Sequence, residues 1–433
     1  MPYLLNLVYL ALLVVLSPWL FWSAIRKGKY REGFGAKLLG LVPRRKGNQP
    51  CIWLHAVSVG EVNVLQPLVE QLRHDYPHCE CVISTTTRTG YEIARKKFAD
   101  LTVFYCPLDF SWSVRAALRR LRPDLLVLAE LELWPNLIRE AHARGTFVAV
   151  VNGRLSEQSA RGYGRIRAFV RPLLRCIDLI AVQSEEYADR FIALGADPSV
   201  VQVTGSMKFD GAQTNRNNDT TSQLRQLAGI SVRDIVFLAG STQSPEEQLA
   251  VETFRLLKDE FAQLRLILVP RHPERFEEVA QLLDLSGLPW QRRSKLGLAR
   301  DNSARILLVD SMGELSAWWG SAHIGFVGGS MGTRGGQSMI EPAAYGVATA
   351  FGPKTRNFRD VVQLMLRREA AVVVHDGSEM AAFVEKCLRH RDYTRALGMR
   401  AQKLVSEQLG ATAKTTALLS WLLPDAKSRR RAA

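Results

Sequence analysis

The sequence predicts an α/β protein built from two doubly wound, Rossmann-like domains that face each other across a cleft. Its 433 residues exceed what one compact core usually holds, which favours two domains. Apolar runs of strand length alternate with amphipathic helical stretches, the order of a parallel sheet covered on both faces. Residues 211–222 (GAQTNRNNDTTS) interrupt this alternation with a polar segment that is typical of a linker.

The chain accordingly divides into five predicted parts. These are an amino-terminal anchor (1–27), a first domain (28–210), the linker (211–222), a second domain (223–425) and a basic tail (426–433). The expected strands are 51–55, 79–85, 125–129, 146–151 and 179–183 before the linker, and 235–239, 264–269, 306–309, 323–327, 347–351 and 371–374 after it. Ligands of such sheets bind at the carboxyl ends of the strands, where we look for a site.

The amino-terminal segment 3–25 is almost wholly apolar and would cover roughly 30 Å as a helix, about one hydrocarbon core. Aromatic residues cluster at its end and a basic flank follows at once (Arg26, Lys27, Lys29 and Arg31). This pattern predicts a membrane-spanning anchor with the rest of the chain in the cytoplasm. The alternative is a helix that lies in the membrane interface, because Ser17-Pro18 would kink it.

Composition bounds the partners and cofactors. The net charge of +15 favours anionic partners such as acidic lipid, nucleic acid or a phosphorylated substrate. The six cysteines form no CxxC pair and no zinc spacing, which predicts a reducing compartment and no structural metal. We also expect no cofactor. No known nucleic-acid-binding motif occurs and basic residues rarely alternate with aromatic ones, so we expect no nucleic-acid partner.

The first candidate cluster is His55-Ala-Val-Ser-Val-Gly-Glu61, where a buried strand ends and a helix begins. Glu61 is expected in the first helical turn, where a carboxylate can accept a proton from a sugar hydroxyl as general base. The helix amino terminus is expected to stabilise its ionised form. The alternative is a capping box, because Ser58-x-x-Glu61 also satisfies the free amides of a helix start.

Two more clusters lie in the first half. Glu130 and Glu132 directly follow an apolar strand, so at least one should point into the cleft, although Pro135 also fits simple helix-start chemistry. Burial beside another carboxylate would raise a pKa there. Lys208, in Val-Thr-Gly-Ser-Met-Lys-Phe-Asp before the linker, could steady negative charge on a leaving phosphate. The alternative for Lys208 is an ordinary solvated charge.

The second half offers sites for an anion at three strand ends. Gly240-Ser-Thr-Gln-Ser244 separates a strand from a helix, a position suited to anion binding by backbone amides. Arg271 can grip a phosphate or carboxylate with two parallel hydrogen bonds, and His272 could hold a base or phosphate. Met312-Gly313-Glu314 opens a helix after the strand 306–309.

A glycine-rich loop follows the expected strand 323–327. Its five glycines are expected to expose backbone amides to a phosphate (Gly328, Gly329, Gly332, Gly335 and Gly336). The spacing matches neither the GxGxxG nor the Walker pattern, which disfavours dinucleotide and P-loop sites. Ser338-x-x-Glu341 also fits a capping box, but that interpretation leaves the glycines unexplained.

The chain resembles the Kdo transferases, which move 3-deoxy-D-manno-octulosonic acid from CMP-Kdo onto the lipid A precursor. The resemblance rests on HAVSVGE, ELELWPNL, NGRLS, VTGSMKFD, VPRHPERF and MGEL followed by FVGGS, which occur in the family's order and cover nearly the whole chain. It implies a GT-B fold, an inverting and metal-independent transfer, and attachment to the cytoplasmic face of the bacterial inner membrane.

The resemblance also implies residue roles. Glu61 matches the catalytic base, and Glu130 and Lys208 match groups that stabilise the transition state. The contacts to CMP-Kdo are matched by Arg271, His272, Met312, Gly313, Glu314 and the run from Ser338 to Glu341. Family members commonly read GGHN where this chain has Gly335-Gly-Gln-Ser338, so the imidazole and amide are lost and the resemblance supports Glu341 more than Gln337 or Ser338.

Two alternatives stay open from the sequence. One is another GT-B enzyme that uses a UDP-sugar, either a transferase or an epimerase. The other is a membrane-bound protein without enzymatic activity that binds anionic lipid or nucleic acid through its +15 charge. Stabilisation by CMP rather than UDP would separate the first from a Kdo transferase, and salt-sensitive nucleic-acid binding without transferase activity would support the second.

Overall fold

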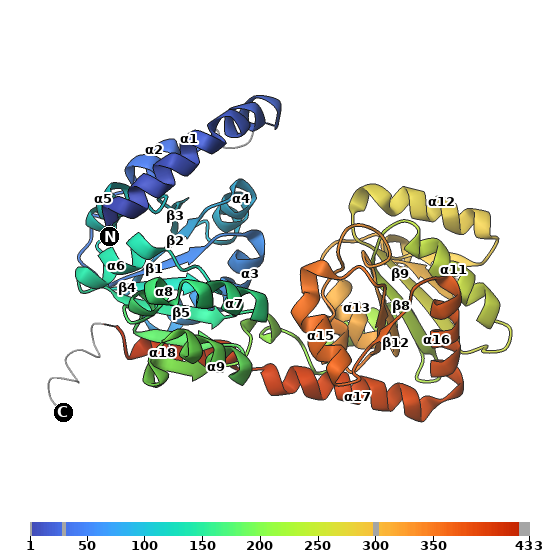
Figure 1. Cartoon of the computed structure of the whole chain (residues 1–433). Coiled ribbons are helices and arrows are strands. Elements are labelled where there is room, and N and C mark those ends of the chain that lie inside the picture. The colour runs from blue at the N-terminus through green and yellow to red at the C-terminus, as the bar shows by residue number, and fades with distance from the viewer. Residues whose placement is uncertain (1, 28–31, 298–302, 424–433) are drawn as a thin grey trace. The chain divides into compact units, whose positions relative to one another are not determined.

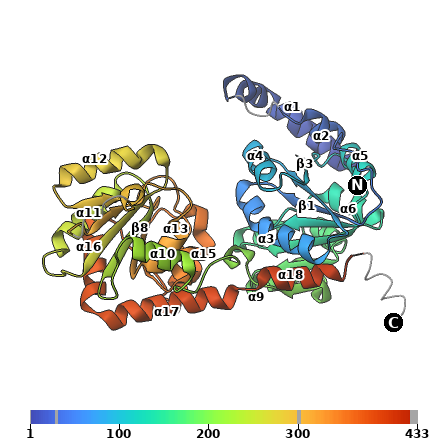
Figure 2. The ribbon, with the colours of Figure 1, turned by 180° about the vertical axis from the view of Figure 1, so that it is seen from behind.

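Two compact units make up the chain. Unit 1 comprises Met1–Asp210 and Gln408–Ala433, and unit 2 comprises Gly211–Glu407. The computed structural model describes residues 2–27, 32–297 and 303–423. Each unit contains one parallel sheet with helices on both faces (Figures 1 and 2).

The sheet of unit 1 has seven parallel strands in the order β3-β2-β1-β4-β5-β6-β7. The strand order reverses between β1 and β4, which pair directly through Ile52 and Leu125 and the residues that follow. Ligands bind at such a reversal in doubly wound sheets. The strands are β1 Cys51–Ala56, β2 Glu80–Thr85, β3 Thr102–Tyr105, β4 Leu125–Ala129, β5 Phe147–Gly153, β6 Leu179–Val182 and β7 Val201–Val203.

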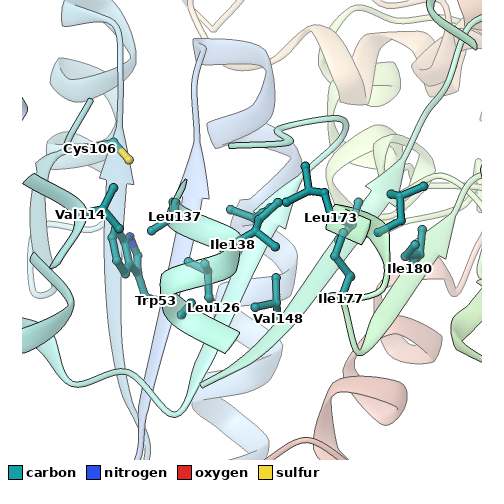
Figure 3. Close-up of a cluster of buried hydrophobic side chains, with 14 of the residues drawn as sticks. Trp53, Cys106, Val114, Leu126, Leu137, Ile138, Val148, Leu173, Ile177 and Ile180 are labelled. Carbon is teal, nitrogen blue, oxygen red and sulfur yellow. The ribbon is translucent and has the colours of Figure 1, made fainter. Parts of the chain in front are cut away.

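Two apolar cores flank this sheet, because the central strands are buried on both faces. One core packs α5, α6, α8 and α9 on the sheet around Trp53, Leu126 and Ile138 (Figure 3). The other packs α3, α4 and α18 on the opposite face, with Leu65 and Leu68 at its centre. The helices are α2 Phe34–Leu39, α3 Val59–Asp75, α4 Arg88–Lys97, α5 Ser111–Leu121, α6 Pro135–Ala143, α7 Glu157–Arg165, α8 Arg167–Leu174, α9 Glu185–Leu194 and α18 Ala411–Ser420.

Unit 2 repeats the plan with the strand order β10-β11-β9-β8-β12-β13-β14, all parallel, and the order reverses between β8 and β12. Its strands are β8 Ile235–Thr242, β9 Leu264–Pro270, β10 Trp290–Arg292, β11 Ile306–Leu308, β12 Ile324–Val327, β13 Ala348–Phe351 and β14 Val372–Val373. Its helices are α10 Asp219–Leu227, α11 Glu246–Leu257, α12 Phe276–Ser286, α13 Leu315–Ser321, α14 Ile340–Ala344, α15 Arg359–Arg367, α16 Gly377–Arg389 and α17 Arg391–Gln408. A core around Phe237, Leu266 and Phe326 holds the sheet and helices together.

The carboxyl-terminal helix α18 belongs to unit 1, whereas the sequence placed 223–425 in one domain. The Asp210 carboxylate accepts hydrogen bonds from the amides of Gly410 (2.7 Å) and Thr412 (2.5 Å) at the start of this helix. Leu419 and Leu422 then join the core beside α3. The amphipathic pattern of a last helix cannot indicate which of two sheets it covers.

The polar segment 211–222 is packed on unit 2. Arg216 donates to the Tyr345 carbonyl at 2.6 Å, and Asn218 caps α10 by accepting from the Thr221 amide. Asn218 also donates to the Tyr345 hydroxyl. The second half of the expected linker is therefore a helix start rather than a free loop, because its Asn and Thr residues are also good capping residues.

The first helix, α1 (Pro2–Lys27), belongs to unit 1 and is tied to α5 through Asn6. The Asn6 side chain is buried, donates to the Ser111 hydroxyl at 2.8 Å and accepts from the Ser111 amide. Large apolar side chains farther along stay exposed, among them Leu7, Val14 and Val15. Over the described residues, no helix meets the length and apolarity needed to cross a membrane. The predicted spanning anchor stays a prediction.

Candidate functional site

The acidic cluster of unit 1 lies at the reversal of its strand order. The loop after β1 leads into α3, whose first turn carries Glu61, and the loop after β4 carries Glu130 and Glu132. Because β1 and β4 are neighbouring parallel strands, their carboxyl ends meet at one sheet edge. The charges of the three carboxylates act on one another there. The structure therefore brings together the acidic residues that the sequence proposed separately.

Glu61 is buried, with a residual exposure of 9%. Its carboxylate accepts from the Val57 amide and the Ser58 hydroxyl, each at 2.8 Å. Burial raises the pKa of Glu61, and these two hydrogen bonds only partly oppose that rise. The net pKa shift of Glu61 is therefore opposite to the one expected from the helix amino terminus alone, because desolvation is its largest cause. The capping box is half formed, since the Ser58 side chain makes no capping hydrogen bond.

Glu130 and Lys208 form an ion pair, with 3.0 Å between Lys208 Nζ and Glu130 Oε1. Glu130 has a φ of 55°, a left-handed conformation that a non-glycine residue seldom adopts outside functional sites. Lys208 lies on the short helix Met207–Phe209, whose first amide donates to the Asn152 side chain at 3.1 Å. Asn152 also has a positive φ of 52°. Lys208 is thus held at the acidic cluster and is not an isolated surface charge.

Glu132 completes the cluster. It accepts from the Trp134 indole at 2.9 Å. Burial, followed by the charges of Glu61 and Glu130, raises the pKa of Glu132 to about 7. The buried His55 packs its ring edge-on to Trp134, and burial lowers its pKa to about 4, which keeps it neutral. Glu132 is therefore part protonated near neutral pH, beside Glu61 and the Glu130–Lys208 ion pair.

The glycine loop of unit 2 holds an internal carboxylate. Glu246, at the start of α11, accepts from the amides of Gln243, Gly329, Ser330 and Met331 at 2.7 to 2.9 Å. Gly328 must be glycine, since a Cβ there would lie 2.6 Å from the Thr242 Cα. The expectation that these strand-end amides bind a ligand anion is wrong for Gln243 and 329–331, because Glu246 already occupies them. The loop from Gly332 to Ser338 is the part left for a ligand.

Arg271 and Glu341 lie near each other at the carboxyl edge of this sheet. Arg271 follows β9, its side chain is exposed, and its amide donates to the Thr242 carbonyl at 3.1 Å. Burial raises the pKa of Glu341, and the charge of Arg271 partly opposes the rise. His272 lies 3.9 Å from Glu274 and caps no helix with its side chain. An exposed guanidinium beside a partly buried carboxylate suits a ligand that carries both a phosphate and hydroxyl groups.

Glu314 is engaged within the protein. Its carboxylate makes a bidentate pair with Arg293, at 2.9 and 2.8 Å, and accepts from the Ser311 hydroxyl at 2.8 Å. These contacts hold the turn at Met312, which is 59% exposed, and Gly313, which has a φ of 89°. Glu314 therefore holds this turn in position, and the Met312-Gly313 backbone stays accessible to a ligand.

Ser338 lies before α14 but does not cap it. The N-terminal cap of α14 is Met339, and no side-chain hydrogen bond is made there. The capping-box alternative for Ser338 and Glu341 is therefore wrong. The Gln337 side chain packs over Gly329, within 3.4 Å of the place a Cβ would take.

Sequence reasoning assigned no role to Glu132, Asn152 or Glu246. A positive φ at Asn152 and an internal carboxylate at Glu246 leave no spacing signal, because each depends on strands distant in sequence. Glu132 was named but passed over for Glu130, since alternation alone cannot tell which acid is buried beside Glu61.

Comparison with known proteins identifies relatives that match nearly the whole chain. Residues 31–211 match a family model described as 3-deoxy-D-manno-octulosonic-acid transferase (kdotransferase). A 3-deoxy-D-manno-octulosonic acid transferase of Haemophilus influenzae is 32% identical over 423 residues, which cover 95% of this chain and 97% of that protein. A transferase of the same name from Bordetella pertussis is 32% identical over 420 residues, 93% of this chain and 95% of the relative.

The fold is shared more widely than the sequence. The structure of UDP-GlcNAc 2-epimerase from Neisseria meningitidis, bound to UDP-GlcNAc, superposes with a TM-score of 0.52 at 12% identity. The match covers 83% of this chain and 99% of the epimerase. This likeness supports the predicted α/β fold of two parallel-sheet units.

Proposed function

Because this chain belongs to the 3-deoxy-D-manno-octulosonic acid (Kdo) transferase family, we propose that it transfers Kdo from CMP-Kdo to the lipid A precursor in lipopolysaccharide synthesis. The observation that carries the proposal is the cluster of Glu61 with the Glu130–Lys208 ion pair at the reversal of the first sheet. This cluster offers a buried proton acceptor beside one held cation, which suits transfer to a hydroxyl group.

Glu61 acts as the general base. It removes the proton of an acceptor hydroxyl while that oxygen forms a bond to the anomeric carbon of Kdo. The bond from the same carbon to the phosphate oxygen breaks, and CMP leaves with the electron pair. Attack from the face opposite the leaving group inverts the configuration. The raised pKa of Glu61 makes it a stronger proton acceptor than an exposed carboxylate.

Glu130 and Lys208 stabilise charge during the transfer. The transition state of glycosyl transfer resembles an oxocarbenium ion, so positive charge grows on the sugar while negative charge grows on the leaving phosphate. Glu130 is fixed by its own strained backbone and by the 3.0 Å contact with Lys208. A fixed carboxylate and ammonium need no rearrangement as these charges develop.

Unit 2 is the proposed donor site. Arg271 faces the phosphate, Glu341 and His272 face the nucleoside, and the backbone of 312–313 and 332–338 supplies further polar contacts. That the two units face each other across a cleft stays a prediction from the sequence.

Attachment of the body to the cytoplasmic face of the inner membrane is part of the proposal. Its support is α1, which keeps Leu7, Val14, Val15 and Trp22 exposed while Asn6 ties it to α5. Exposed apolar side chains followed by basic residues favour an anionic bilayer surface.

The test is incubation of the full-length protein with CMP-Kdo and lipid A precursor, with products read by mass spectrometry. Glu61→Gln keeps an acceptor for Val57 and Ser58 but loses the base, so turnover should fall about 10²–10⁴-fold with CMP-Kdo binding retained. Glu70→Gln, on the exposed side of the same helix, is the matched control. Near-normal turnover of Glu61→Gln would exclude Glu61 as base, and no Kdo product from the wild type would overturn the proposed function.

A further inference from the structure

A basic hollow lies beside the glycine loop of unit 2 and shares Gly332, Thr333 and Gly335 with the segment assigned above to the donor. It measures about 430 Å³ and is lined by Gly332, Thr333, Gly335, Pro353, Lys354, Thr355, Arg356 and Arg359. None of these residues is acidic, and three of them are cationic. The residues that line the hollow lie in the segments that follow β12 and β13. The hollow therefore opens at the carboxyl edge of the sheet, where Arg271 also lies after β9.

Backbone contacts fix the basic segment against the loop. The Lys354 amide donates to the Ser330 carbonyl, and the Asn357 amide donates to the Gly335 carbonyl, both at 2.9 Å. The Asn357 side chain adds a hydrogen bond to the Arg334 carbonyl at 2.8 Å. A Cβ at Gly335 would lie 2.6 Å from the Arg356 Cγ, so the chain can approach this closely only through glycine. The loop and the cations therefore form one wall.

The cations of this wall lack a counter-charge. Lys354, Arg356 and Arg359 are exposed, and within the described part of the chain no carboxylate pairs with any of them. Arg359 is the first residue of α15, a helix that begins without a side-chain cap and presents its positive end here. Elsewhere in unit 2, arginines such as Arg275 and Arg293 are paired with glutamates. An oxyanion is the ligand that such a hollow accepts.

We propose that this hollow binds the carboxylate of the donor sugar, an inference that rests on the proposed function. In CMP-Kdo the anomeric carbon carries both the phosphate oxygen and the carboxyl group. The two anions are therefore separated by a single carbon atom. A phosphate held by the amides of 332–338 places the carboxylate at the flank of the same loop, where Lys354 and Arg356 lie.

This assignment accounts for donor selection. Nucleotide-linked hexoses carry no carboxyl group on the anomeric carbon, so they would leave Lys354 and Arg356 without a partner. A site built around a charged group of its substrate rejects an analogue that lacks the group more strongly than an apolar pocket can. The hollow thus identifies the donor as a sugar acid, within a fold that an epimerase acting on an uncharged sugar also has.

The experiment compares two ligands on the full-length protein. Binding of CMP-Kdo and of CMP is measured by calorimetry without acceptor, for wild type, Lys354→Ala and Arg356→Ala. Each variant should bind CMP-Kdo about 10-fold more weakly, since a hydrogen-bonded charge pair is lost. CMP, which lacks the carboxylate, should bind within about twofold of wild type. Arg356→Lys should restore part of the affinity. Arg233→Ala removes one exposed charge just before β8, at the opposite sheet edge, and should change neither affinity.

Three outcomes would overturn the assignment. Equal losses for CMP and CMP-Kdo would place the nucleotide phosphate in the hollow. Unchanged CMP-Kdo binding with a raised KM for the lipid acceptor would assign the hollow to an acceptor phosphate. Unchanged affinities for CMP-Kdo and CMP, together with an unchanged KM for the lipid acceptor, would show that the hollow is a solvated surface that binds none of them. A wild type that binds CMP-Kdo but forms no Kdo product would instead refute the proposed function, so the two failures are distinguishable.

Discussion

At the scale of single residues, three neighbouring carboxylates of unit 1 differ through their surroundings. Glu61 accepts two hydrogen bonds, Glu130 pairs with Lys208, and Glu132 has only the Trp134 indole. The pKa of Glu132 therefore rises to about 7, because burial and two nearby acids act on it with little compensation. A protonated Glu132 limits the repulsion that three ionised groups would create.

This difference predicts a pH-dependent stability. The folded pKa of Glu132, about 7, lies above the ordinary carboxyl value of 4.5, so the folded chain binds more protons than the unfolded chain between these pH values. Stability of unit 1 should fall as the pH rises through this window. Glu132→Gln should stabilise unit 1 by about 1–2 kcal/mol at pH 8, with the Coulomb part discounted for partial exposure, and by little at pH 4.5.

Hydrogen exchange of the β4 amides measures this effect without interference from unit 2. Glu70→Gln, at an exposed position, should match the wild type at both pH values. A Glu132→Gln protein less stable than wild type at pH 8 would show that the ionised carboxylate is needed by the fold.

Glu246 supports a second prediction at the residue scale. Four backbone amides converge on its carboxylate, and an amide side chain cannot accept from all of them. Glu246→Gln should destabilise unit 2 by about 2–4 kcal/mol, because buried donors lose their acceptor, and should weaken CMP binding by loosening the loop. Glu252→Gln, on the exposed side of α11, is the control for calorimetric unfolding. An unchanged transition would mean that water can replace the carboxylate.

At the scale of elements, the central strands were predictable, whereas of the four edge strands in the described residues only β14 was predicted, as 371–374. Four central strands are buried on both faces, namely β1, β4, β8 and β9. Their runs of apolar residues indicate this burial in the sequence itself. β3, β7 and β10 were missed, because each is short, lies at a sheet edge and keeps partly exposed residues. The acidic and basic strand ends could be read from the sequence, whereas Glu246 in the glycine loop depends on packing between distant strands.

The first helix leads to a prediction about attachment. Val14 and Val15 are 70% and 74% exposed on α1, a poor arrangement in water but a favourable one at a lipid surface. Val14→Asp with Val15→Asp should reduce binding to vesicles of anionic lipid at least about 10-fold, through lost apolar burial and added like charge. Val232→Asp, at a 93% exposed position of unit 2, should leave binding unchanged. If the protein with both Val14→Asp and Val15→Asp sedimented with vesicles as fully as the Val232→Asp protein, attachment through α1 would be refuted.

At the scale of the whole molecule, the two units carry different sets of polar side chains at their sheets. Unit 1 gathers carboxylates and one lysine at the reversal of its sheet, while unit 2 gathers glycine and arginine at the equivalent place. In the proposed function, the same strand arrangement serves proton removal in one unit and anion binding in the other. The carboxyl-terminal helix α18 returns to unit 1, so the chain crosses between the units twice. Sequence alternation predicts two sheets but cannot show that second crossing.

Separate cores predict separate responses to ligand. A ligand that binds only the folded form of one unit stabilises that unit by about 2.7 kcal/mol at 100 times its dissociation constant. CMP should therefore raise the unfolding temperature of the transition that belongs to unit 2 and leave that of unit 1 in place. UDP at the same concentration should raise neither, if the donor is a CMP-sugar. Scanning calorimetry of the full chain, with Glu246→Gln to identify the unit 2 transition, measures both. Stronger stabilisation by UDP than by CMP would favour a UDP-sugar enzyme on this fold over Kdo transfer.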